Sequence, residues 1–365
     1  AFYGCSKISR LKISKYAESI GSYAFYGLNS LPAISISNNV KEIGSHAFEA
    51  CSSATALYLP DSVTTIGAYA FSSCSKIAEI AIPDSVTKMG AYAFSGCSSV
   101  KKFSIGSGVK AIEKYTFKNC TGLTSITVPD TVETIAADAF YGCNNVTEIT
   151  LPFVGESRTA TDYKATFGYV FGYTTYNAAE KKSYDNTGSN YSYGVYSSDT
   201  GKEICSTSYS SNYQERYQSS RSTTFQNCYV YTSSKPWYTC YDYYNSSYKH
   251  YNGTYGPYNL QTYSYYVPNG LTSVTITDAD KIETAAFNNC KNITKITLND
   301  GVTSIGDYAF QQCTALKDYA IPETVAKIGS YAYYGDNALT EMYIPDTVKT
   351  LDRKSGSAGM PRPIS

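Results

Sequence analysis

Apolar and polar residues follow a regular period along most of the chain. In the segment 77–94, Ile80 and Ile82 alternate with polar or small residues, which predicts a strand with one buried face. Pro83 ends this strand, because proline cannot donate a hydrogen bond to a ladder. The pattern then repeats, and its aromatic position recurs at steps of 23 residues: Phe2, Phe25, Phe48, Phe71, Phe94, Phe117 and Phe140, then Phe287, Phe310 and Tyr333.

The second half of each repeat has a different spacing. Val86 and Met89 are predicted to point inward after the turn that follows Pro83. In the segment 90–97, small and apolar residues follow at spacings of 3, 1 and 3, which predicts a short helix with one apolar stripe. Each repeat is therefore expected to contain a strand, a turn and a helix.

A repeat of 20–29 residues with this content is typical of a leucine-rich-repeat solenoid. A single coil cannot cover its own apolar face, so stability must come from stacking on its neighbours. We predict an α/β solenoid, a stack of 23-residue coils with a parallel β-sheet and one continuous hydrophobic spine. The structural residues expected in that spine are Phe48, Phe71, Phe94, Cys74 and Cys97.

Cysteine occurs 11 times, and most copies follow the same period. Eight of them lie three residues after the repeated aromatic position, where we expect buried free thiols that pack as small apolar groups. In the last repeat Asp336 takes this place, which we interpret as the approach to a more polar end of the stack. Outside the period, Cys228 and Cys240 could form a disulfide or remain free.

The period stops after Pro152 and resumes at Leu271. We expect the stack to continue across this gap, with strand 149–151 paired to strand 274–276, and the apolar stretch 168–173 to contact the solenoid. The predicted domains are repeats at 1–152, an insert at 153–270, repeats at 271–352 and a linker-like tail at 353–365. The chain starts inside a repeat, so we expect it to be part of a longer precursor.

The insert has an unusual composition. It holds 24 of the 39 tyrosines between Tyr163 and Tyr266, together with the only tryptophan and many Ser, Asn and Gly residues. This mixture resembles antibody binding loops, and aromatic rings also suit stacking on sugars. The insert could be a β-rich binding module, an ordered structural element or flexible chain. Its candidate binding surface is Tyr229, Tyr231, Trp237, Tyr241, Tyr243, Tyr244, Tyr248, His250 and Tyr251.

Charge and candidate chemistry narrow the function further. The formal net charge is zero, with 30 basic and 30 acidic residues, so no nucleic-acid partner is expected. No apolar run is long enough to insert in a membrane. His46 is expected to be an exposed surface residue, and His250 has no nucleophile and partner beside it. We therefore predict no enzyme, no cofactor and no metal.

The outer face of the predicted sheet is a second candidate surface, because extended faces are how solenoids usually bind. An ordinary solvated face is the alternative. The positions predicted to face outward are mixed in charge and mostly small: Arg10, Lys12, Ser35, Tyr58, Glu79, Lys102, Ser104, Ser125, Thr127, Glu148, Thr150, Lys295, Thr297, Asp318, Glu341 and Tyr343.

The repeat text itself resembles a known family. The pattern Ile-Pro-Asp-Ser-Val-Thr-x-Ile-Gly-x-Tyr-Ala-Phe-x-x-Cys-Ser-x-Leu appears nearly intact at 59–77 and 82–100. It is similar to the BspA-type leucine-rich-repeat family of surface proteins, including the slot that holds Asn39, Ser62, Ser85, Thr131 and Thr324.

This resemblance implies a non-catalytic, adhesin-like binding protein that is extracellular or on the cell surface. Its implied partner is a host or microbial surface protein or glycan. The alternative is a structural spacer or a self-assembling surface-layer or filament unit, which would associate end to end through open solenoid ends.

Overall fold

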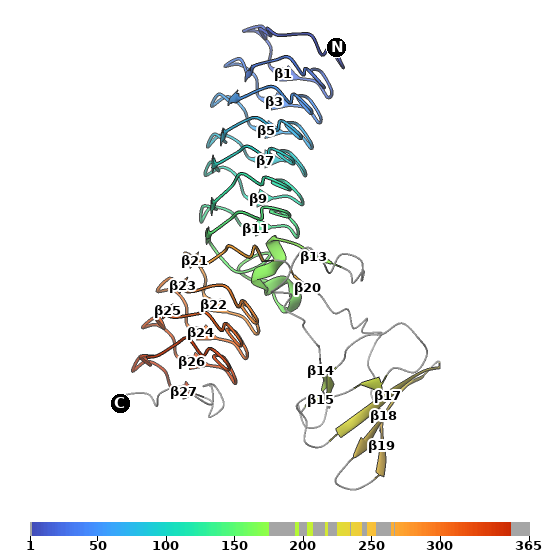
Figure 1. Ribbon diagram of the computed structural model, residues 1–365, viewed down its shortest axis with the longest axis vertical. Helices are drawn as coiled ribbons and strands as arrows, with labels where there is room; N and C mark the ends of the chain where they lie inside the picture. The colour runs from blue at the N-terminus through green and yellow to red at the C-terminus, as the bar shows by residue number, and fades with distance from the viewer. Residues whose placement is uncertain are drawn as a thin grey trace. The chain divides into compact units, whose positions relative to one another are not determined.

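The computed structural model contains two compact units (Figure 1). Residues 1–189 together with 265–365 form the first unit, and residues 190–264 form the second. The structure describes residues 2–174 and 267–351, and between them the backbone of several strands.

The first unit is a stack of coils held by two ladders of short parallel strands. In the first ladder, each strand aligns with the strand one repeat later, so that Ile80 pairs with Phe103 and Ile126 with Ile149. Its strands are β2 (Ala33–Ser35), β4 (Ala56–Tyr58), β6 (Glu79–Ala81), β8 (Lys102–Ser104), β10 (Ser125–Thr127), β12 (Glu148–Leu151), β21 (Ser273–Ile276), β23 (Lys295–Thr297) and β25 (Asp318–Tyr319).

The second ladder lies where the sequence indicated only a turn. Met89 in β7 pairs with Ile66 in β5, and both side chains are buried. These strands are β1 (Ser19–Ile20), β3 (Glu42–Ile43), β5 (Thr65–Ile66), β7 (Lys88–Met89), β9 (Ala111–Ile112), β11 (Thr134–Ile135), β22 (Lys281–Ile282), β24 (Ser304–Ile305), β26 (Lys327–Ile328) and β27 (Thr350–Leu351).

Burial along the strands follows the predicted alternation. In β6 the central Ile80 is fully buried, while Glu79 and Ala81 face solvent. The residues expected on the outer face are all exposed or half-buried, from Arg10 to Tyr343. The predicted inward positions Val86 and Met89 are also buried, so the two-residue period correctly identified which face of the sheet lies in the core.

The predicted helix in each coil is wrong. The segment 90–97 is a series of turns instead of a helix. Alternate amides in it donate to the next coil: Tyr92 N to Lys114 O at 3.2 Å, Phe94 N to Thr116 O at 2.9 Å and Gly96 N to Lys118 O at 2.7 Å. Amides paired with a neighbouring coil cannot also form the bonds within one segment that an α-helix needs.

The turns at 90–97 form the third side of the coil, after the strands of the two ladders. Left-handed backbone conformations make these turns possible. Two residues per coil have positive φ, such as Tyr92 at 60° and Gly96 at 75°. At the corner before this side, Gly90 lies so close to the preceding coil that an added Cβ would be 2.4 Å from Ala68 N. Glycine is therefore required there for close approach of the two backbones.

The repeated aromatic side chains line up in one row, as the sequence predicted. The rings of Phe48 and Phe71 are stacked with centroids 5.6 Å apart, and Phe71 and Phe94 with centroids 5.4 Å apart. The row continues to Phe117 and Phe140 at 5.8 and 5.5 Å. Each ring thus contributes to two interfaces between coils.

The periodic cysteines form a second row beside the aromatic spine. Cys74 and Cys97 are buried free thiols, as predicted. Each also donates a hydrogen bond to the carbonyl oxygen of the phenylalanine 26 residues earlier: Cys74 Sγ to Phe48 O at 3.2 Å and Cys97 Sγ to Phe71 O at 3.3 Å. Because Cys51 N and Cys74 N already donate to these oxygens, the thiol adds a second donor in addition to filling space.

The hydroxyl slot noted in the repeat text also links neighbouring coils. Ser62 donates to Val40 O, Ser85 to Val63 O and Thr324 to Val302 O, each at 2.7 Å. In these three coils the short hydroxyl side chain thus pairs with a carbonyl oxygen of the preceding coil, whereas the Thr131 hydroxyl has no such partner.

The segment between the two sets of repeats contains short elements. Two 3₁₀ helices, η1 (Asp162–Ala165) and η2 (Phe167–Val170), follow β12. The strands are β13 (Tyr173–Thr174), β14 (Gly194–Tyr196), β15 (Glu203–Ser206), β16 (Arg216–Tyr217), β17 (Phe225–Ser233), β18 (Lys235–Asp242), β19 (Ser247–Asn252) and β20 (Ser264–Tyr265).

Replacing Phe94 with alanine is expected to destabilise the stack by about 3–5 kcal/mol, because the cavity would lie between two coils. Denaturant titration would measure the loss. Phe2→Ala is the matched control, since Phe2 is 46% exposed and stacks only on Phe25. Equal losses for the two variants would show that the spine is not the main source of stability.

The buried thiols are expected to resist alkylation. Burial raises the pKa of Cys97, Cys143 and Cys290 to about 12, so these thiols are protonated at pH 8 and out of reach of reagent. Cys5 is exposed and should react with iodoacetamide in the native protein. Peptide mass spectrometry would compare native and guanidinium-unfolded chain; native labelling of Cys97 as fast as Cys5 would contradict the expectation.

Candidate functional site

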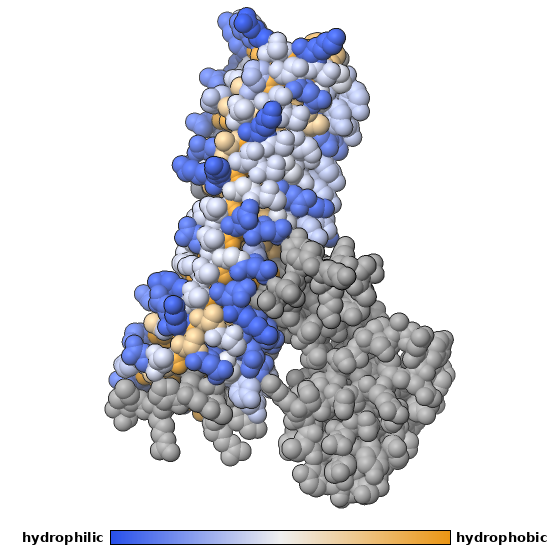
Figure 2. Space-filling model, viewed as in Figure 1, coloured by the Kyte–Doolittle hydropathy of each residue, from blue (hydrophilic) through white to orange (hydrophobic). Residues whose placement is uncertain are grey.

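The outer face of the first strand ladder offers a mostly neutralised polar surface. Lys102 Nζ lies 3.4 Å from the Glu79 carboxylate, and Lys295 Nζ lies 2.8 Å from that of Asp318. Tyr58 and Tyr343 are 62% and 63% exposed. In the view of Figure 2, the coloured surface of the coils is mainly hydrophilic, with a narrow hydrophobic line along the stack. Charge alone does not identify a ligand for it.

A ladder of stacked rings runs along the third side of the stack. Tyr23, His46, Tyr69 and Tyr92 are successive rungs with ring centroids 4.4, 4.7 and 4.4 Å apart. His46 is half-buried between two tyrosine faces, and its Nδ1 pairs with the Glu49 carboxylate. The expectation of an exposed His46 is therefore wrong, because ring stacking in the left-handed position covers it.

The hydrophobic spine continues through the gap in the repeats. Phe140 contacts Phe171 with ring centroids 6.5 Å apart, and Phe167 stacks on Phe287 at 5.1 Å. The backbone follows the same path, since Phe140 N donates to Val170 O at 2.9 Å and Phe167 N to Ala286 O at 2.8 Å. Residues 167–171 therefore replace one coil's third side, and the predicted contact of this stretch with the solenoid is confirmed.

Strand pairing also crosses the gap. β12 and β21 are parallel neighbours, with Ile149 opposite Val274 and Leu151 opposite Ile276. Beyond these strands, Thr277 N donates to Leu151 O at 3.0 Å. The hypothesis of an unbroken stack is confirmed, although the repeat pattern ends at Pro152. The coil continues to Gly172 before the chain leaves it, and the chain returns to the stack at Val267.

Arg158 joins the coils on both sides of this junction. Its guanidinium donates to Asp130 O at 2.7 Å and Val132 O at 3.1 Å, and Nε donates to the Asp278 carboxylate at 2.9 Å. The group also lies over the Phe153 ring, 5.2 Å from its centroid. A planar, always charged side chain is suited to several partners at once. The sequence analysis missed Arg158, because it lies outside the period.

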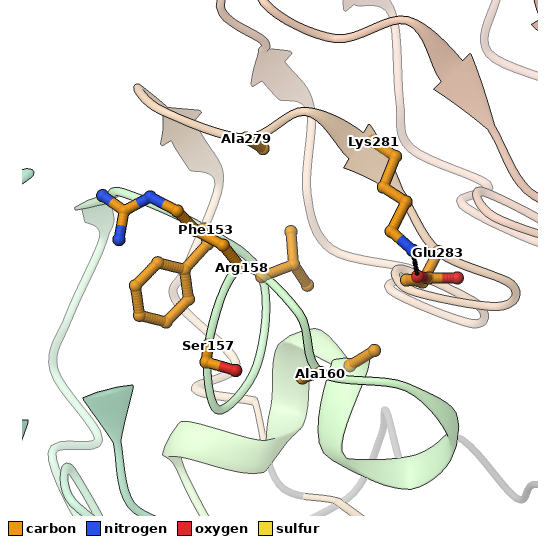
Figure 3. A pocket seen from close by; sticks show the side chains of 9 residues that line it. Phe153, Ser157, Arg158, Ala160, Ala279, Lys281 and Glu283 are labelled. Atoms are coloured by element: carbon orange, nitrogen blue, oxygen red, sulfur yellow. Dashed lines mark ion pairs between the residues drawn. The ribbon is translucent and has the colours of Figure 1, made fainter. Parts of the chain in front are cut away.

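A small cavity lies beside this arginine. Phe153, Ser157 and Ala160 line one side, and the Lys281–Glu283 ion pair lies across from them (Figure 3). Its volume is about 10 Å³, close to the minimum that one water molecule needs. A substrate or cofactor would not fit, so the junction is best described as a structural connection.

In the second unit, strands β16 to β19 form an antiparallel sheet in sequence order. The register places Tyr231 opposite Trp237, and Tyr241 opposite Tyr248. Residues directly opposite each other share a face of a sheet, and so do residues two apart along a strand. Six of the nine candidate binding residues therefore share one face: Tyr229, Tyr231, Trp237, Tyr241, Tyr248 and His250.

The other three candidates are not on this face. Tyr251 is opposite Tyr238 and belongs to the reverse face. Tyr243 and Tyr244 follow the end of β18 and lie outside the described residues. On the same reverse face, Cys228 is the direct partner of Cys240. This register is compatible with a disulfide, which is one of the two alternatives that the sequence left open.

Groups that could support other chemistry are scarce. Within the residues that the structure describes, no group of three or more His, Cys, Asp or Glu side chains is placed to hold a metal ion. The described part of the chain also contains no helix with the length and apolar character needed to cross a bilayer.

The family assignment follows from the repeats. A model of the BspA type leucine rich repeat region matches in six copies, over residues 1–123, 110–160 and 238–355. These ranges cover well over half of the chain. The chain belongs to the BspA-type leucine-rich-repeat family. Its coils are those of a repeat scaffold, and the resemblance seen in the sequence is confirmed.

Several solved structures are similar to this BspA-type chain. A leucine-rich repeat protein from Bacteroides ovatus has 20% identity and a TM-score of 0.38, covering 96% of this chain and 76% of its own. A leucine rich cell surface protein from Faecalibacterium prausnitzii has 22% identity and a TM-score of 0.38, covering 94% and 68%. The leucine-rich repeat protein of T. pallidum has 33% identity and a TM-score of 0.36, covering 40% and 65%. No curated protein matches this chain.

Arg158→Ala is expected to loosen the junction by about 2–3 kcal/mol, because it removes charge-assisted hydrogen bonds to two coils at once. Arg158→Lys should restore little, since one ammonium cannot reproduce the guanidinium geometry. Hydrogen exchange of peptides covering 153–165 would measure the opening.

Lys41→Ala is the matched control for this experiment. Lys41 pairs with Glu18 at 3.3 Å, but both side chains are well exposed, so its loss should cost less than about 1 kcal/mol. If Arg158→Ala and Lys41→Ala had the same small effect, Arg158 would not be a joint between the two sets of coils.

Proposed function

We propose that this chain is a non-catalytic, adhesin-like binding protein of the cell surface or extracellular space, and that the tyrosine-rich insert carries its recognition face. The observation that carries the proposal is the strand register, which gathers Trp237, His250 and four tyrosines on one side of the β16–β19 sheet. Tyrosine and tryptophan provide large contact areas at a low cost in conformational entropy.

The composition of this face favours a glycan or a glycosylated surface protein as the partner. Aromatic rings pack on the apolar faces of sugar rings. The same face also carries Arg216, Thr239 and Asn252, whose side chains can hydrogen-bond to hydroxyl groups. No acid–base pair or nucleophile is required for binding of this kind.

The solenoid supports the proposal as a scaffold. Its strand ladder and spine are complete across the junction, through the pairing of β12 with β21 and the contacts of Phe167 and Phe171. The segment between Gly172 and Val267 can therefore bind a partner without its residues being needed to hold the coils together.

A glycan and matrix-protein array is the experiment that tests this function. The full chain should bind one class of ligand, and a variant with 175–266 replaced by a short Gly-Ser bridge should lose that binding while keeping the thermal stability of the coils. The deletion must start after Gly172, because Phe167, Val170 and Phe171 are core residues. Unchanged binding would move recognition to the solenoid.

Point variants then separate the two faces of the sheet. Trp237→Ala should weaken binding by tenfold or more, since aromatic residues dominate binding energies. Tyr238→Ala is the matched control on the reverse face, and it should change affinity less than about threefold. Equal effects of the two variants in a titration would contradict the assigned face.

A further inference from the structure

One buried carboxyl group interrupts the row of thiols. Asp336 takes the cysteine position of its coil and is 0% exposed, so it lies in the core and not on a polar end surface. Its Oδ1 accepts a hydrogen bond from Cys313 N at 2.8 Å. Its Oδ2 is buried and has no partner. An unpaired carboxylate oxygen in the core is costly.

The other coils show what this position normally does. In six coils the cysteine thiol donates to the phenylalanine carbonyl oxygen 26 residues earlier, at 3.1–3.4 Å. The last of these is Cys313 Sγ, which donates to Phe287 O at 3.1 Å. The equivalent acceptor for position 336 is Phe310 O. Phe310 O already accepts a hydrogen bond from Cys313 N at 3.0 Å, and in the other coils the thiol adds a second donor to the equivalent oxygen. An ionised carboxylate has no donor to place there.

We propose that Asp336 is protonated in the folded stack and donates through Oδ2–H to the Phe310 carbonyl oxygen, so that closure of the C-terminal coils depends on pH. A protonated carboxyl group supplies one donor and keeps acceptor capacity on its other oxygen. This is the combination that the slot offers, because Cys313 N already occupies Oδ1.

The groups around Asp336 do not supply a charge that would keep it ionised. Tyr319 and Tyr333 lie near it in the same coil, and their hydroxyls are bonded to each other at 2.9 Å. Cys313 faces it from the preceding coil, and burial raises the pKa of all three of these groups. Within the described residues, Asp336 takes part in no ion pair. As pH rises, Asp336 is therefore the first of these four groups to lose its proton.

The direction of the pH effect follows from linkage. Burial raises the pKa of Asp336 to about 8, whereas an aspartate in an opened chain has a pKa of about 3.9. Closing thus takes up a proton. The contribution to stability is complete below pH about 4, falls as pH rises, and reaches its lowest value above pH about 8. Between these limits the opening constant rises tenfold per pH unit.

Hydrogen exchange of the full chain from pH 5.5 to 7.5 tests the proposal, with rates corrected for intrinsic exchange. Peptides covering 333–351 should open about 100-fold more readily at the higher pH. Peptides covering 94–105, where Cys97 fills the slot, are the internal control and should show no such change. A flat profile for 333–351 would overturn the proposal.

Asp336→Asn isolates the role of the proton. Its amide keeps an acceptor for Cys313 N and a permanent donor for Phe310 O, so the C-terminal coils should be stable and their opening independent of pH. Asp336→Cys restores the ordinary residue of the slot and gives a second pH-independent variant if the amide does not fold. A pH slope that persists in either folded variant would show that another group controls these coils.

Discussion

Backbone hydrogen bonding between coils is the constraint on which this structure depends. Every coil is short, and each of its three sides pairs with the next coil. The pairs are formed by strands of the first ladder, by strands of the second ladder and by alternate amides of the turns. Bonds within one coil close its turns, as from Ala93 N to Gly90 O, while the strands and alternate turn amides bond to neighbouring coils. The same register therefore has to be kept at each step. Paired residues are 23 positions apart, so the 23-residue period of the sequence follows from this register.

This constraint also explains where sequence reasoning succeeded and where it failed. The alternation of Ile80 and Ile82 with exposed residues depends only on which face is buried, so the strand and the spine of Phe48, Phe71 and Phe94 could be predicted. The helix could not, because spacings of 3, 1 and 3 fit either a helix or a turn with two left-handed residues. Only the pairing of Phe94 N with Thr116 O decides between them.

Single residues outside the repeat were harder to interpret. Arg158 hydrogen-bonds to three residues that are far away in sequence, Asp130, Val132 and Asp278, so no local pattern marks it. Asp336 was visible as a substitution, but its meaning depends on burial and on the thiol-to-carbonyl bonds of the other coils. For the insert, the composition left a β-rich module as one of three alternatives, and only the strand register shows that Tyr231 lies opposite Trp237.

The short segment that ends at Phe171 has an evolutionary consequence. It closes its coil with its own aromatic rings and amides, so the neighbouring coils already have their partners before the chain continues to position 175. Under the proposed function, mutations in the tract that follows are expected to change what is bound more than how the coils assemble. If that function holds, a lineage could replace this tract with a different binding segment and keep the same aromatic spine.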